Sequence, residues 1–188
     1  YAFYHSGMSG AVIFPDDIEK IDSYAFSSTS ISSISLPKEL KSIGDEAFKD
    51  NAHLVGNLAL PNSLENIGTS AFENCQFSGN LHLPDGLKTI GRASFCNAGS
   101  FSGNLEIPEM ISLIYGSTFE GSKFTGNLIF KGNPTFAESS YISIGNEGAF
   151  EGCGFSGELV IPDGVQDIPA NAFSGNEFSS IVFPNSFS

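Results

Sequence analysis

Hydrophobic residues recur along this chain with a period close to 23 positions, which is longer than the period of any single helix or strand. A hydrophobic residue followed by proline marks each period. The pair stands at Phe14-Pro15, Leu36-Pro37, Leu60-Pro61, Leu83-Pro84, Ile107-Pro108, Ile161-Pro162 and Phe183-Pro184. The long gap after Pro108 contains one further copy, in which Lys131 replaces the proline after Phe130. The pattern predicts a chain of repeats.

Each repeat carries further hydrophobic positions at fixed distances from its anchor. Isoleucine follows the anchor by six positions, at Ile21, Ile43, Ile67, Ile90, Ile114 and Ile168. Phenylalanine recurs once in each repeat, at Phe3, Phe26, Phe48, Phe72, Phe95, Phe119, Phe150 and Phe173. Of the 18 phenylalanines, we assign all but Phe136 to repeat positions. A single coil cannot bury these residues alone, whereas stacked coils align them into continuous ladders, so the repeats predict a solenoid.

Two local patterns predict the elements of each coil. Leu58-x-Leu60, Leu81-x-Leu83 and Leu105-x-Ile107 alternate with period two, which is typical of short strands. From Ile43 to Asn51 the apolar spacing fits one helical or 3₁₀ turn. We therefore expect an α/β-type solenoid, a right-handed array of about eight coils with one parallel β-sheet on one side and short helical or 3₁₀ turns on the other.

The repeat Leu-Pro-x-x-Leu-x-x-Ile-Gly-x-x-Ala-Phe-x-x-Cys/Asn resembles the BspA-like leucine-rich repeat. Residues 61–75 match it throughout, and the resemblance covers essentially the whole chain. Lys131 in place of proline is one departure, and Asp22, Tyr115 and Pro169 replace the usual glycine. The resemblance implies a surface-attached or secreted adhesin of a host-associated microbe, located extracellularly or at the cell surface. It also implies matrix, plasma or host surface proteins as partners.

The sixth coil is longer than the others, and we place an insertion at 132–141 (GNPTFAESSY). This segment holds Phe136 and Tyr141, which we take as candidate binding residues because solenoid insertions form loops, often on the binding face. Phe136 could instead pack back onto the coil.

Residues 1–188 are expected to form a single leucine-rich-repeat domain, a fragment of a longer array, since neither end resembles a capping repeat. Copies could then associate end to end through open sheet edges.

The outward strand positions form a second candidate site. These positions are Ile13, Ser35, Ala59, His82, Glu106, Ile129, Val160 and Val182. Ile129, Val160 and Val182 predict an apolar patch near the C-terminal end, and such patches usually mark interaction sites. His82 and Glu106 are included as polar members of the same row. The alternative is a choice of residues with high β-propensity at half-buried sites.

Charge and chemistry narrow the function classes. The formal charge of −13 argues against nucleic acid and anionic lipid as partners, and no apolar run reaches the ~20 residues of a membrane span. His5, His53 and His82 occupy different coil positions and should not converge. No catalytic motif is present, and the isolated acids do not form a calcium site, so we expect no enzyme activity, no cofactor and no metal. Cys75 and Cys153 should be buried thiols in the slot that asparagine fills elsewhere.

The leading hypothesis is a non-enzymatic protein-binding or adhesion module. One alternative is a structural spacer or stalk that displays another domain. Another is a carbohydrate-binding module, with Phe136 and Tyr141 offering aromatic faces.

Overall fold

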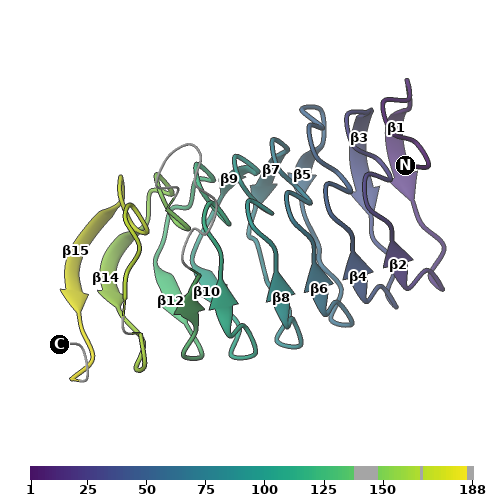
Figure 1. Cartoon of the computed structure of the whole chain (residues 1–188). Helices are drawn as coiled ribbons and strands as arrows, with labels where there is room; N and C mark the ends of the chain where they lie inside the picture. Colours follow the sequence, from purple (N-terminus) through teal and green to yellow (C-terminus); the bar gives the residue numbers. More distant parts are fainter. Residues whose placement is uncertain (138–147, 166, 186–188) are drawn as a thin grey trace.

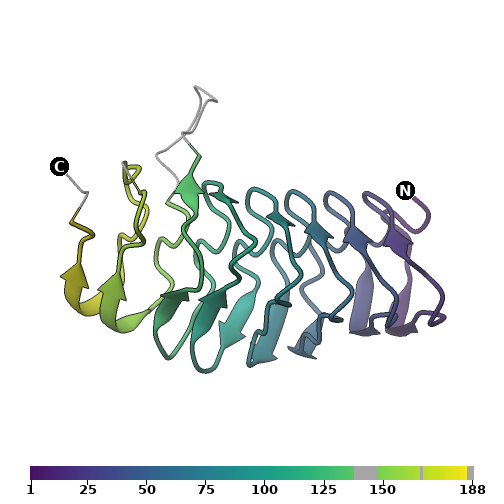
Figure 2. The same cartoon turned by 90° about the horizontal axis from the view of Figure 1, so that it is seen from below.

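The chain forms an elongated solenoid whose coils lie side by side from the N-terminal to the C-terminal end (Figures 1 and 2). The computed structural model describes residues 1–137, 148–165 and 167–185. It has about seven turns, consistent with a leucine-rich-repeat array, because the eight repeated phenylalanines bound seven intervals. The expectation of about eight coils counted the phenylalanines rather than the turns between them.

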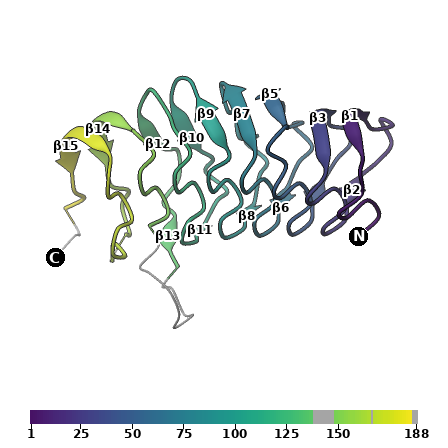
Figure 3. The same ribbon diagram turned by 90° about the horizontal axis from the view of Figure 1, so that it is seen from above.

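Two rows of parallel strands run along the solenoid, on opposite sides of it (Figure 3). The long-strand row contains β1 (Ser9–Ile13), β3 (Ser30–Ser35), β5 (Val55–Asn57), β7 (Gln76–Gly79), β9 (Gly99–Phe101), β10 (Leu105–Ile107), β12 (Leu128–Phe130), β14 (Ser156–Val160) and β15 (Glu177–Val182). The short-strand row contains β2 (Lys20–Ile21), β4 (Ser42–Ile43), β6 (Asn66–Ile67), β8 (Thr89–Ile90), β11 (Leu113–Ile114) and β13 (Thr135–Phe136).

The expectation of one continuous sheet is wrong, because the described strands divide into six parallel sheets. Leu105–Ile107 is a strand as expected, but Leu58–Leu60 and Leu81–Leu83 are not. In those two coils the hydrogen-bonded ladder lies a few residues earlier, where β5, β7 and β9 pair. The leucines are nevertheless buried, so the alternating pattern predicted their burial correctly but predicted the paired strand at the wrong residues.

The helical turns are also absent from the described residues, so the α/β assignment is wrong. From Gly44 to Asp50 the chain makes two consecutive turns, in which Ala47 N donates to Gly44 O and Lys49 N donates to Glu46 O, both at 3.3 Å. The intervening amides donate instead to the next coil, as Phe48 N does to Ala71 O at 2.9 Å. In a helix these amides would donate to carbonyl oxygens of their own coil, and the carbonyl oxygens of the next coil would have no donor.

Stacked phenylalanine rings form the centre of the core. Phe48 and Phe72 have ring centroids 5.5 Å apart and nearly parallel planes. Stacking continues through Phe95, whose ring is inclined by 26° to that of Phe72, and on through Phe119 and Phe150 to Phe173. Offset stacks at this separation are favourable beyond the area they bury. The predicted phenylalanine ladder is therefore confirmed.

A mostly polar ladder lies beside the rings, three residues after the ladder phenylalanines, and Ala98 after Phe95 is its apolar member. Asn51 Nδ2 donates to the carbonyl oxygen of Phe26 in the preceding coil at 2.8 Å, and Cys75 Sγ contacts that of Phe48 at 3.3 Å. Cys153 makes the same contact with Phe119 O at 3.1 Å. The expectation that Cys75 and Cys153 are buried thiols in the asparagine slot is confirmed.

Candidate functional site

The predicted apolar row lies on the long-strand side of the solenoid. Val160 pairs with Val182 in the β14–β15 ladder, and Ile129 pairs with Glu106 in the β10–β12 ladder. Ile129, Val160 and Val182 are 36%, 50% and 44% exposed. The three side chains thus remain open to solvent on successive strands of a rigid scaffold.

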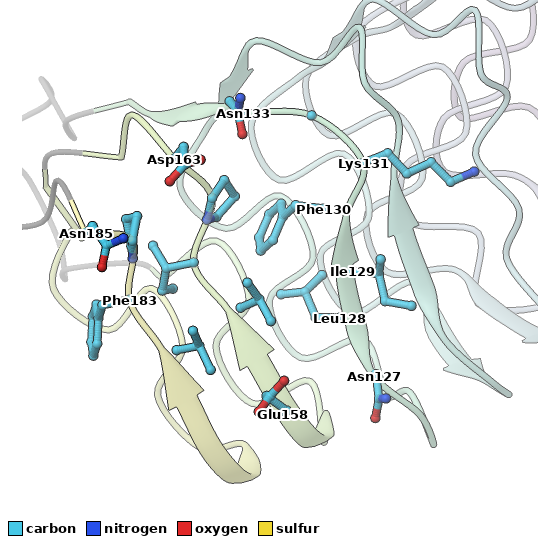
Figure 4. A pocket seen from close by; sticks show the side chains of 16 residues that line it. Asn127, Leu128, Ile129, Phe130, Lys131, Asn133, Glu158, Asp163, Phe183 and Asn185 are labelled. Atoms are coloured by element: carbon cyan, nitrogen blue, oxygen red, sulfur yellow. The ribbon is translucent and has the colours of Figure 1, made fainter.

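A groove of about 670 Å³ opens among these strands, and we call it the β12–β14 groove (Figure 4). Its walls come from β12, β14 and β15 and from the turn that follows each strand. The lining residues include the outward Ile129, Val160 and Val182, together with Phe183 at the C-terminal side. The sequence pattern predicted the apolar row but not this hollow.

The groove lies where strand pairing is interrupted. β12 pairs with β10 and β14 pairs with β15, but β12 and β14 belong to different sheets. The two coils stay in contact at their start, where Ser156 N donates to Gly126 O at 3.1 Å. The interruption coincides with the long sixth coil, in which Phe136 precedes Phe150 by fourteen positions, whereas Ile114 precedes Phe119 by five.

His82 and Glu106 lie farther along the same side, in a separate hollow of about 380 Å³. Both side chains are exposed, and Leu81 and Leu83 form the apolar floor. The structure therefore brings the five described strand candidates onto one face but divides them between two hollows. Only Ile129, Val160 and Val182 share a groove.

The two sides of the β12–β14 groove differ in charge. Lys131 points away from the groove in Figure 4, and its Nζ lies 2.9 Å from Glu106 and 3.4 Å from Asp85. Hydrogen bonds to Glu106 and Asp85 raise the pKa of Lys131, so its charge is already balanced there. Glu158 and Asp163 line the groove. The sequence after Lys131 contains seven acids and no lysine or arginine.

The placement of Phe136 outside the repeat pattern is wrong. Phe136 pairs with Ile114 in the β11–β13 ladder and thus occupies the isoleucine position, six residues after Phe130. Its ring is half-buried and packs edge-on against Phe173 at 5.7 Å and Phe150 at 6.5 Å. The first part of the predicted insertion, 132–137, follows the regular coil, and its remainder, with Tyr141, lies outside the described residues.

One aromatic cluster was missed at the N-terminal end. Tyr1 stacks on Tyr24 with centroids 4.8 Å apart, and Tyr4 contacts both rings edge-on. Tyr1 and Tyr24 each precede a ladder phenylalanine by two positions, so their shared place in the repeat was the available signal.

The described residues offer little for covalent or metal chemistry. Burial raises the pKa of the Cys75 and Cys153 thiols well above the ordinary range, which keeps them protonated and poorly nucleophilic. Within 1–137, 148–165 and 167–185, no group of three or more His, Cys, Asp or Glu side chains is placed to hold a metal ion.

The stacked parallel coils with their repeated Leu, Ile and Phe positions define a leucine-rich-repeat solenoid. A family model for the BspA type leucine-rich-repeat region matches residues 1–125 and 129–188 in six copies. The chain belongs to this family, whose members are often surface proteins involved in protein interaction or adhesion. No curated protein matches the chain. In the part of the chain that the structure describes, no helix is long and apolar enough to cross a membrane.

Proposed function

We propose that this chain is a non-enzymatic protein-binding module of a cell-surface or secreted protein and that it binds its partner along the long-strand row. The observation that carries the proposal is the exposed apolar row at the β12–β14 groove. At the equivalent strand position, four earlier coils carry Ser35, Ala59, His82 and Glu106, whereas the first coil carries Ile13. Solvent-facing isoleucine and valine are therefore not required by the coil itself. Membership of a family often involved in surface interaction and adhesion supports the same conclusion.

A binding screen of the whole chain against immobilised extracellular-matrix and plasma proteins tests this proposal. Val160→Ser is the informative variant, because Ser35 shows that serine is compatible with this strand position. Ile13→Ser is the matched control. Ile13 holds the equivalent position in β1, is 78% exposed and lies at the far end of the solenoid.

Saturable binding that Val160→Ser weakens and Ile13→Ser leaves unchanged would support the proposal. Binding that both variants retain would move the site away from the groove. A folded chain that binds no protein would contradict the proposal and favour a spacer, whereas binding only to a parallel glycan array would favour the carbohydrate-binding alternative.

A further inference from the structure

The shape, apolar lining and charge of the β12–β14 groove together specify one kind of occupant. We infer that the groove binds an extended segment of a partner protein in which apolar side chains alternate with polar ones and lysine or arginine flanks them. This inference rests on the proposed function and names the partner class for the same site.

The strand geometry favours an extended segment. The groove lies beside β12 and β14, whose facing edges are not joined in one sheet. Its apolar contacts, Ile129, Val160 and Val182, stand on β12, β14 and β15, which follow one another in the long-strand row. An extended peptide places every second side chain on one side, so its apolar residues can meet this row while its alternate residues face solvent.

Exposed apolar area at this end extends beyond the three row residues. Phe183 is 48% exposed and lines the groove beside Val182. Burial of β-branched and aromatic side chains is the main favourable term in protein association. Apolar residues in the occupant therefore provide the affinity.

Electrostatics favours a cationic occupant over a neutral or anionic one. Glu158 stands on β14 and Asp163 on the turn after it, and both line the groove. Lys131 also lines the groove, but its ammonium group is paired with Glu106 and Asp85 and points away. Glu158 accepts a hydrogen bond from Ser180 Oγ at 3.4 Å, and this carboxylate has no cation partner among the described residues. Lysine or arginine flanking the apolar residues would complement this field.

Three labelled synthetic peptides test the inference by fluorescence anisotropy with the whole chain. The first is Lys-Val-Thr-Val-Thr-Val-Lys, the second has glutamate at both ends, and the third has threonine in place of every valine. We expect the first peptide to bind about tenfold more tightly than either of the others, with an affinity that falls as salt is raised.

Two variants assign the effect to this groove. Glu158→Gln with Asp163→Asn should remove most of the preference for lysine over glutamate ends while leaving the valine dependence. Val160→Ser should weaken the first peptide, and Ile13→Ser should not. Circular dichroism and the unfolding midpoint of each variant verify that the fold is retained.

Equal binding of the three peptides, no binding of the first, or a charge preference that survives the double variant would overturn the inference. A protein from the matrix and plasma screen whose binding depends on Val160, combined with no peptide binding, would leave the proposed function standing. In that case the partner would use a folded surface rather than an extended segment. If the chain binds no protein in the screen and none of the peptides, both the proposed function and this inference are rejected.

Discussion

At the scale of single residues, the stability of the solenoid depends on side chains that satisfy buried backbone carbonyls between coils. Asn51 is the fullest example, because its amide nitrogen donates to Phe26 O and Phe48 O and its Oδ1 accepts from Thr29 Oγ1 at 2.6 Å. Cys75 and Cys153 provide a weaker contact with the equivalent carbonyl one coil back.

We expect Asn51→Ala to lower the free energy of unfolding by about 3 kcal/mol, because several buried polar groups lose their partner at once. Asn51→Cys should cost less, since Cys75 shows how a thiol fills this slot. Asn66→Ala is the control, because its hydrogen bond to Thr89 is exposed. Urea unfolding measures all three, and equal losses for Asn51→Ala and Asn66→Ala would contradict the role of the ladder.

Ser94 is a residue that the fold tolerates rather than uses. Its hydroxyl is buried and has no hydrogen-bond partner among the described residues, and equivalent positions carry Ala47, Ala71 and Ala149. Ser94→Ala should raise the free energy of unfolding by about 1 kcal/mol. Ser122→Ala should lower it by a similar amount, because Ser122 Oγ donates to Phe95 O and accepts from Ala98 N. A loss of stability in Ser94→Ala would refute this interpretation.

The buried thiols give stability a defined pH dependence. The folded pKa of Cys75 is raised by burial, while the unfolded thiol ionises near its ordinary value of 9.0. The unfolded state therefore releases a proton above that pH and the folded state does not, so this contribution to stability is constant below pH 9 and falls above it. Cys75→Ser should reduce the alkaline slope by up to about 1.4 kcal/mol per pH unit in denaturant titrations. An unchanged slope would show that Cys75 ionises in the folded state.

At the scale of elements, the turn in each coil explains why the helical expectation failed. The apolar spacing from Ile43 to Phe48 is shared by a helical turn and by two consecutive β-turns. The residue two positions after each ladder phenylalanine distinguishes the two structures, because its φ is positive in every coil, between 50° at Asn97 and 70° at Gly175. Asn74, Gly121 and Gly152 also occupy this position, and asparagine and glycine are the residues that adopt this conformation most readily.

Gly152→Ala tests this backbone conformation directly. A Cβ there would meet only the end of the Lys123 side chain at 3.8 Å, so any cost comes from the positive φ rather than from a clash. We expect a loss of about 1 kcal/mol. Gly86→Ala is the matched control, because its φ lies outside the left-handed region and its Cβ would have ordinary contacts. Equal unfolding midpoints for the two variants would contradict the turn assignment.

The placement of Phe136 outside the repeat pattern is also an error at the scale of elements. Its spacing of six residues from Phe130 already matched the isoleucine position, but the long gap before Phe150 made the whole segment look irregular. A periodic hydrophobic pattern predicts the ladder positions well, because these positions are buried. Strand pairing and turn geometry depend on which backbone groups meet between coils, and hydrophobicity does not encode that choice.

At the scale of the whole molecule, the repeated coil gives a regular scaffold, and differences between coils give it the candidate site. The sequence was sufficient to predict the apolar row, because Ile129, Val160 and Val182 share one repeat position. It did not predict the groove, which lies where β12 and β14 belong to different sheets. Charge segregation adds to this asymmetry, since every lysine and arginine lies at or before Lys131.

Hydrogen–deuterium exchange of the chain, alone and with a partner from the binding screen, tests the central claim most directly. We expect amides of β12, β14 and β15 to gain protection on binding, together with the turns after these strands that line the groove. Amides of β2, β4, β6 and β8 on the opposite side should exchange as before. Protection confined to that opposite row, or no change at the three groove strands in a saturated complex, would contradict the account.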